Sequence, residues 1–89
     1  MEYELHNLME TIIADRYDKM KNEYAQCQCE QCELDIKAFA LNRLPSKYFV
    51  SEKGALFAKL DFLTIEFEAM ITTELMLAFE TIGSKPRHN

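Results

Sequence analysis

Three cysteines lie within the six residues of the stretch CQCEQC, residues 27–32, and the sequence contains no other cysteine. The spacing is C-x-C-x2-C, so Cys29 and Cys32 have the two-residue gap of a metal knuckle, in which a turning backbone aims both sulfurs at one ion. Cys27 can supply a third thiolate from the entering end of the loop. Because thiolates prefer soft or borderline metals, the triplet predicts a zinc site. An iron–sulfur cluster and three unmetallated thiols are the alternatives.

A structural zinc ion takes four ligands, and the spacing does not specify the fourth. The candidates are His6, His88, a carboxylate such as Asp35, or a residue of a partner subunit. An open fourth position holding water would instead indicate a zinc hydrolase, but no paired general base is recognisable beside the cysteines. The sequence also shows no Ser-His-Asp arrangement, no phosphate-binding glycine loop and no H-E-x-x-H motif. We therefore expect a structural metal site in a protein that is not an enzyme.

The composition is that of one small globular domain. Of 89 residues, 48% are apolar and 28% charged, with only two glycines and two prolines, which argues against disorder. A chain of this size buries little surface, so a metal ion or an oligomer interface is a common supplement. The sequence has neither a membrane-length apolar stretch nor a signal-peptide pattern. We expect a cytoplasmic protein without membrane association, in which the thiols stay reduced.

Charge is distributed unevenly along the sequence. The formal net charge is −5, but residues 36–60 hold five basic residues and one acidic residue, a formal +4, and the remainder carries −9. Within the basic segment, Arg43, Lys47 and Tyr48 form a candidate site for an anionic ligand. In the alternative, Arg43 pairs with a carboxylate and Tyr48 packs against the core. Specific DNA binding is not expected, since any basic segment attracts the phosphate backbone at low salt.

The spacing of apolar residues predicts an all-α fold. Residues 4–24 repeat them every three or four positions, which is typical of one helical face. Asp35 is expected to cap a short second helix over residues 36–42, and Pro45 to end it near Arg43. The cysteine-rich zinc loop then lies between the first two helices. The stretch LPSKYFV that follows predicts a turn and an extended piece.

A long C-terminal helix is predicted over residues 52–82, capped by Ser51 and closed by Gly83 in the left-handed conformation. One of its two apolar rows can pack on the first helix, but the other needs a partner. We therefore predict a helix-mediated homodimer. In the alternative, the helix breaks near residues 69–73 and folds back. Residues 1–83 would form the single domain and residues 84–89 a flexible basic tail.

The run from Tyr24 to Val50 holds, in order, C-x-C-x2-C, Asp35-Ile36, Ala40-Leu41-Asn42, Leu44-Pro45 and Tyr48. In this pattern the sequence resembles the late competence development protein ComFB family. The resemblance implies a small, mainly helical, dimeric protein without known enzymatic activity that binds zinc through Cys27, Cys29 and Cys32. A regulatory or adaptor protein with a protein partner is the first expectation. Some relatives are described as receptors for cyclic dinucleotides such as c-di-GMP, which is the alternative for the basic segment.

Overall fold

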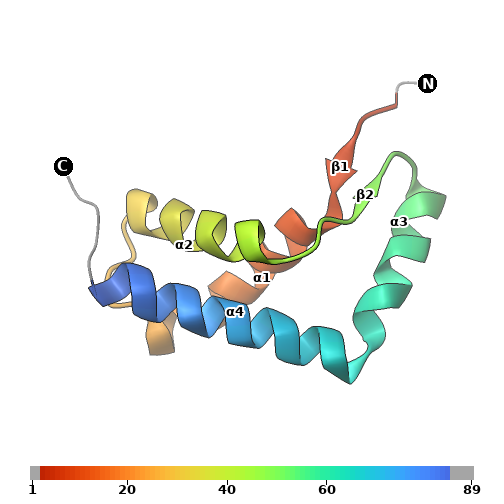
Figure 1. Cartoon of the computed structure of the whole chain (residues 1–89). Coiled ribbons are helices and arrows are strands. Elements are labelled where there is room, and N and C mark those ends of the chain that lie inside the picture. The colour runs from red at the N-terminus through yellow and green to blue at the C-terminus, as the bar shows by residue number, and fades with distance from the viewer. Residues whose placement is uncertain (1–2, 85–89) are drawn as a thin grey trace.

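The computed structural model describes residues 3–84. Its elements, in chain order, are β1 (His6–Asn7), α1 (Leu8–Tyr24), α2 (Glu30–Arg43), β2 (Tyr48–Phe49), α3 (Glu52–Leu60), the 3-10 turn η1 (Asp61–Leu63) and α4 (Ile65–Ser84) (Figure 1). The predicted all-α fold is confirmed. Of the predicted tail, residues 84–89, Ser84 is the last residue of α4 and the others lie outside the described residues.

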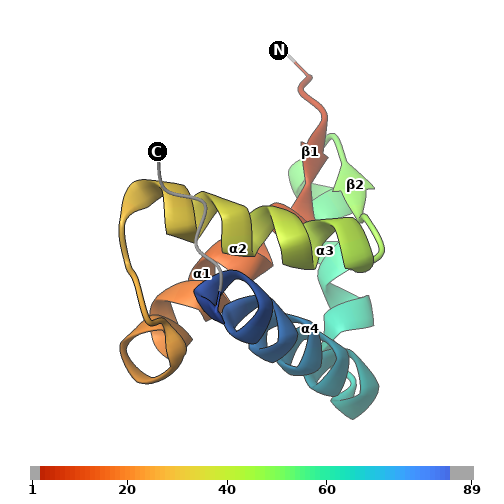
Figure 2. The same ribbon diagram turned by 60° about the vertical axis from the view of Figure 1, so that its left-hand side comes forward.

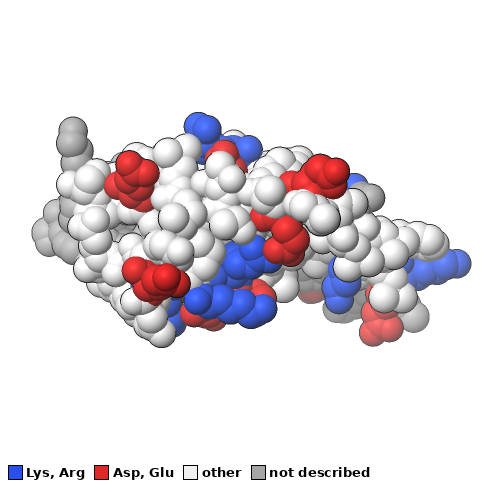
Figure 3. Space-filling view, turned by 90° about the horizontal axis from the view of Figure 1, so that it is seen from below, with Lys and Arg blue, Asp and Glu red and all other residues white. Residues whose placement is uncertain are grey.

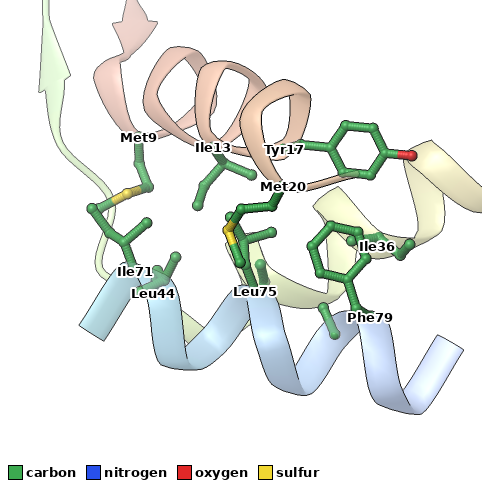
Figure 4. Packing of buried hydrophobic residues seen from close by; sticks show 11 residues of the cluster. Met9, Ile13, Tyr17, Met20, Ile36, Leu44, Ile71, Leu75 and Phe79 are labelled. Atoms are coloured by element: carbon green, nitrogen blue, oxygen red, sulfur yellow. The ribbon is translucent and has the colours of Figure 1, made fainter. Parts of the chain in front are cut away.

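Three helices enclose the core. In Figures 1 and 2, α2 and α4 lie side by side and run in opposite directions, and α1 crosses behind them. α3 projects from the far end of this group and contacts β2, η1 and α1. The buried cluster comprises Met9, Ile13, Tyr17, Met20, Ile36, Ala40, Leu44, Ile71, Leu75, Ala78 and Phe79 (Figure 4). All of these belong to α1, α2 and α4 except Leu44, which directly follows α2.

The first helix is shorter than predicted, because the residues before it form a strand. His6 and Asn7 pair antiparallel with Phe49 and Tyr48, so the extended piece expected after Pro45 is confirmed. Asn7 then caps α1, since its Oδ1 accepts hydrogen bonds from the backbone N–H groups of Met9 (3.2 Å) and Lys47 (2.8 Å). The two-residue sheet thereby fixes where α1 begins.

The second helix begins six residues earlier than predicted, and Asp35 is not its cap. α2 starts at Glu30, after Cys29, whose Sγ accepts a hydrogen bond from the backbone N–H of Cys32 at 3.4 Å. The acidic residues Glu30 and Glu33 in the first turn favour this start, because they interact with the positive end of the helix dipole. The end of α2 at Arg43, before the extended residue Leu44, agrees with the prediction from Pro45.

The prediction of one long helix over residues 52–82 is wrong. The chain forms two helices there, and the helix is interrupted at residues 61–64. Thr64 is extended, and its Oγ1 accepts the backbone N–H of Phe67 at 3.2 Å, so a new helix starts there. The break allows α4 to pack on α1 and α2 while α3 turns away (Figure 1). The predicted cap Ser51 is confirmed, since its Oγ accepts the N–H of Gly54 at 3.0 Å. Gly83 does not end the helix: it is not in the left-handed conformation, and α4 continues to Ser84.

Within residues 3–84, none of the helices combines the length and the apolar character needed to cross a membrane.

Candidate metal centre

The three cysteines lie together at the junction between α1 and α2. Cys27 lies in the connection, Cys29 caps α2, and Cys32 lies in its first turn. Their three Sγ atoms all lie within 4.8 Å of one another. In a tetrahedral site with zinc–sulfur bonds near 2.3 Å, the sulfurs are about 3.8 Å apart, so small side-chain movements bring this set to metal-binding geometry. The residues fit a metal ion held by three thiolates.

The three thiols differ in their surroundings. Cys29 is exposed and Cys27 half-buried, whereas the side chain of Cys32 is only 2% exposed. Burial, followed by hydrogen bonding to the thiols of Cys27 and Cys29, raises the pKa of Cys32 to about 12. A bound cation would reverse this, because it stabilises the thiolate directly. The first turn of α2 also favours negative charge at the cluster, since the backbone N–H of Cys32 donates to Cys29 Sγ at the positive end of the helix dipole.

The candidates for a fourth ligand are not all near the thiols. β1, which carries His6, lies at the other end of the molecule from the α1–α2 connection (Figure 1), and His6 Nε2 instead lies 3.2 Å from Glu4 Oε2. His88 lies outside the described residues. Among residues 3–84, the close group of metal-ligating side chains consists of the three cysteines, and Asp35 is not part of it. Within residues 3–84, the structure thus brings three thiols together without a fourth ligating side chain at the same distance.

The three residues of the candidate anion site do not converge on a pocket. Arg43 Nε donates a hydrogen bond to Glu74 Oε2 at 2.5 Å, as the alternative interpretation predicted. Tyr48 is exposed on β2, so the expected packing of this ring against the core is wrong. In the described part of the chain, two surface pockets of about 440 and 480 Å³ are lined by other residues, not by Arg43, Lys47 or Tyr48. This geometry does not favour binding of a dianion there.

One ion pair joins the basic segment to the acidic one that follows it. α4 carries most of the acidic residues after residue 60 and packs on α2, and Arg43, the last residue of α2, pairs with Glu74 across this contact. Within α2, Lys37 Nζ lies 2.6 Å from Glu33 Oε2. On the face shown in Figure 3, acidic and basic groups lie next to one another on a mostly uncharged surface. No single-sign patch dominates this face.

One residue near the cysteines was not singled out by the sequence pattern. Tyr17 belongs to the apolar face predicted over residues 4–24, and burial, followed by the proximity of Glu33, raises the pKa of this phenol. The available signal was a phenol near the middle of a face made mostly of aliphatic and methionine side chains, because a buried tyrosine usually needs a partner for its hydroxyl.

Comparison with known proteins agrees with the resemblance seen in the cysteine segment. The family model described as late competence development protein ComFB matches residues 6–86. The chain belongs to the ComFB family. Among solved structures, the late competence protein ComFB from Bacillus subtilis is similar, with a TM-score of 0.78 and 19% sequence identity over 93% of this chain and 94% of that chain. At this identity the similarity concerns the fold. A search among curated proteins found no match.

Metal binding by this ComFB chain should strengthen as the pH rises. With its pKa near 12, the Cys32 thiol of the metal-free protein is protonated at neutral pH, so a metal ion must displace that proton. We expect the apparent metal affinity to rise at least about tenfold per pH unit between about pH 6 and pH 8. Competition with a chelator, corrected for the chelator's own protonation, measures this slope. An affinity independent of pH would contradict thiolate ligation.

Proposed function

We propose that this ComFB protein is a non-enzymatic adaptor in which Cys27, Cys29 and Cys32 hold one structural zinc ion and which acts as a homodimer. The observation that carries the proposal is the convergence of three Sγ atoms within 4.8 Å at the junction of two core helices. Three thiolates favour zinc over the hard cations, which prefer oxygen ligands. When bound, the ion supplies a cross-link between residues of one loop and one helix.

The position of the thiols supports a structural role. Cys32 is buried against the core while Cys27 comes from the connection after α1, so an ion bound by both joins that connection to the first turn of α2. The same connection lies close to the end of α4, where Gln26 is 3.4 Å from the position of a Cβ at Gly83. Fixing the connection therefore stabilises the end of the molecule where α1, α2 and α4 meet. In a chain of 89 residues this supplements a small core.

Cobalt substitution tests the donor set directly. Cobalt(II) bound by three thiolates in a tetrahedral site should give intense sulfur-to-metal charge-transfer bands, saturating at about one ion per chain. Cys32→Ser should weaken these bands strongly, because one thiolate is lost. Gln28→Ser is the matched control, since it alters the same loop without removing a thiol. A chain that binds no cobalt under reducing conditions would refute the metal site.

The homodimer is supported by an exposed apolar strip. This strip, called the α3 strip, has side chains that are 58% to 84% exposed: Leu56, Phe57, Leu60, Leu63 and Ile65. The sequence suggested that one apolar row of the last helix needs a partner. This still holds although the helix is broken before α4, because the residues of the α3 strip face solvent in a single copy. Where exposed apolar side chains such as these form one patch, they usually mark an interaction site. A second copy can cover it by two-fold symmetry, in which each strip packs against the other.

A charge placed in the α3 strip should separate the two copies. We expect the wild-type protein to have a solution mass twice the 10.4 kDa of one chain, and Leu60→Lys to have the mass of a single chain. Light scattering coupled to gel filtration measures both masses. Leu34→Lys is the control, because Leu34 is also exposed but lies on α2. The proposal fails if the wild type is monomeric or if the two variants behave alike.

The adaptor role implies a protein partner, met in the cytoplasm, where clustered thiols stay reduced. Support comes from membership of a competence-associated family and from the distribution of charged and apolar surface described above. A binding assay of the zinc-loaded protein against candidate partner proteins and against cyclic dinucleotides separates an adaptor from a nucleotide receptor. An adaptor should bind a protein and ignore the nucleotides. Micromolar nucleotide binding that Arg43→Ala weakens would overturn the proposal.

A further inference from the structure

The hydroxyl of Tyr17 is buried without a hydrogen-bond partner among the described residues. The side chain as a whole is 0% exposed, so water does not reach it from outside. Burying an unpaired hydroxyl is unfavourable, and native structures rarely leave one without a purpose. Figure 4 shows the hydroxyl pointing away from the aliphatic core and toward the start of α2. This is the region in which Cys29 and Cys32 lie.

The ring of Tyr17 is held in one place by its neighbours. It stacks on Phe79 of α4, with the centroids 5.5 Å apart, and Lys37 Nζ of α2 lies 5.3 Å from its centroid. A ring packed by two other helices cannot turn its hydroxyl elsewhere without disturbing the core. Burial is the largest cause that raises the pKa of Tyr17, so the phenol keeps its proton and remains a donor.

The cysteines need such a donor only when a metal is bound. Three thiolates on a divalent cation carry a net negative charge, part of it on the buried sulfur of Cys32. Cys29 already accepts the backbone N–H of Cys32 at 3.4 Å and is exposed to water. Cys32 is buried in the first turn of α2, toward which the Tyr17 hydroxyl points in Figure 4. Hydrogen bonds to ligand atoms stabilise the charge on the ligand and fix its direction.

We propose that the Tyr17 hydroxyl donates a hydrogen bond to the Cys32 thiolate in the metal-bound protein and is thus a positioning residue of the metal centre. The inference rests on the proposed metal binding and adds a residue that lies 15 positions before Cys32, the ligand that it would contact. It also explains why a phenol, and not a phenylalanine, occupies a fully buried position of the core cluster.

Tyr17→Phe removes the hydroxyl and keeps the ring, and Tyr24→Phe is the matched control, because Tyr24 also contacts Phe79 from α1 but is more exposed. We expect Tyr17→Phe to weaken zinc binding about tenfold in competition with a chelator. The charge-transfer bands of the cobalt(II) form should move to longer wavelength, because a thiolate that has lost a hydrogen bond is easier to oxidise. Tyr24→Phe should change neither quantity.

Thermal unfolding of the metal-free proteins separates this role from packing. Tyr17→Phe should be at least as stable as the wild type without metal, since it removes an unpaired buried hydroxyl. A packing role would instead lower the stability of both forms alike. If wild-type protein binds neither zinc nor cobalt, the proposed function fails. If it binds both and Tyr17→Phe has the same affinity and the same cobalt spectrum, only the inference about Tyr17 is overturned, and the spectrum decides even if the metal-free chains do not fold.

Discussion

Removal of the metal is expected to lower the thermal midpoint of unfolding by more than about 15 °C. A ligand present at a thousand times its dissociation constant stabilises the folded state by about 4 kcal/mol, and each kcal/mol shifts the midpoint of a domain of this size by about 4–8 °C. In the folded chain the thiols converge at the junction of α1 and α2. The part of the binding free energy that is specific to the folded chain appears as folding stability.

Calorimetry with and without a strong chelator measures this shift. Cys32→Ser should unfold near the midpoint of the chelated wild type and should no longer respond to the chelator. Gln28→Ser should respond as the wild type does, since it keeps all three thiols. A chelated wild type with an unchanged midpoint, or a Cys32→Ser variant as stable as the loaded protein, would rule out a structural ion.

Truncation of Leu75 should destabilise the protein about as strongly. Leu75 is fully buried at the centre of the cluster formed by α1, α2 and α4 (Figure 4). Leu75→Ala removes buried methyl groups and leaves a cavity, which costs about 2–5 kcal/mol, a large share of the stability of a small domain. We expect the midpoint of the metal-loaded protein to fall by at least about 10 °C.

The control for this prediction is Leu34→Ala, the same change at an exposed position of α2. It should change the free energy of unfolding by less than about 0.5 kcal/mol. Denaturant unfolding of both variants in the zinc-loaded state gives the comparison. Equal stabilities for Leu75→Ala and the wild type would show that α4 does not pack as described.

The cysteine cluster could be predicted from sequence because its information is local. The spacing of the three residues over six positions already constrains where the sulfurs point, and the structure brings them together as expected. The caps at Ser51 and the end of α2 before Pro45 were equally local. The start of α2 was misjudged because Asp35 is the stronger capping residue, whereas a cysteine thiol performs that role here.

The break between α3 and α4 could not be read from the sequence in the same way. Residues 61–64 contain neither glycine nor proline, and the break there, with Thr64 capping the new helix, accompanies the packing of α4 on α1 and α2. Tertiary packing overrides helix propensity in such a case. The pair of Arg43 with Glu74, and the approach of Tyr17 to the cysteines, likewise join residues of different helices, so no local pattern announced them.

The central claim is that a metal ion held by three thiolates ties the α1–α2 connection to the core of this ComFB protein. Native mass spectrometry of protein purified under reducing conditions, combined with elemental analysis, tests it most directly. The account predicts about one zinc ion per chain in the folded protein and none after substitution of Cys32 by serine. Folded wild-type protein that carries no transition metal, and takes none up when zinc is supplied, would contradict it.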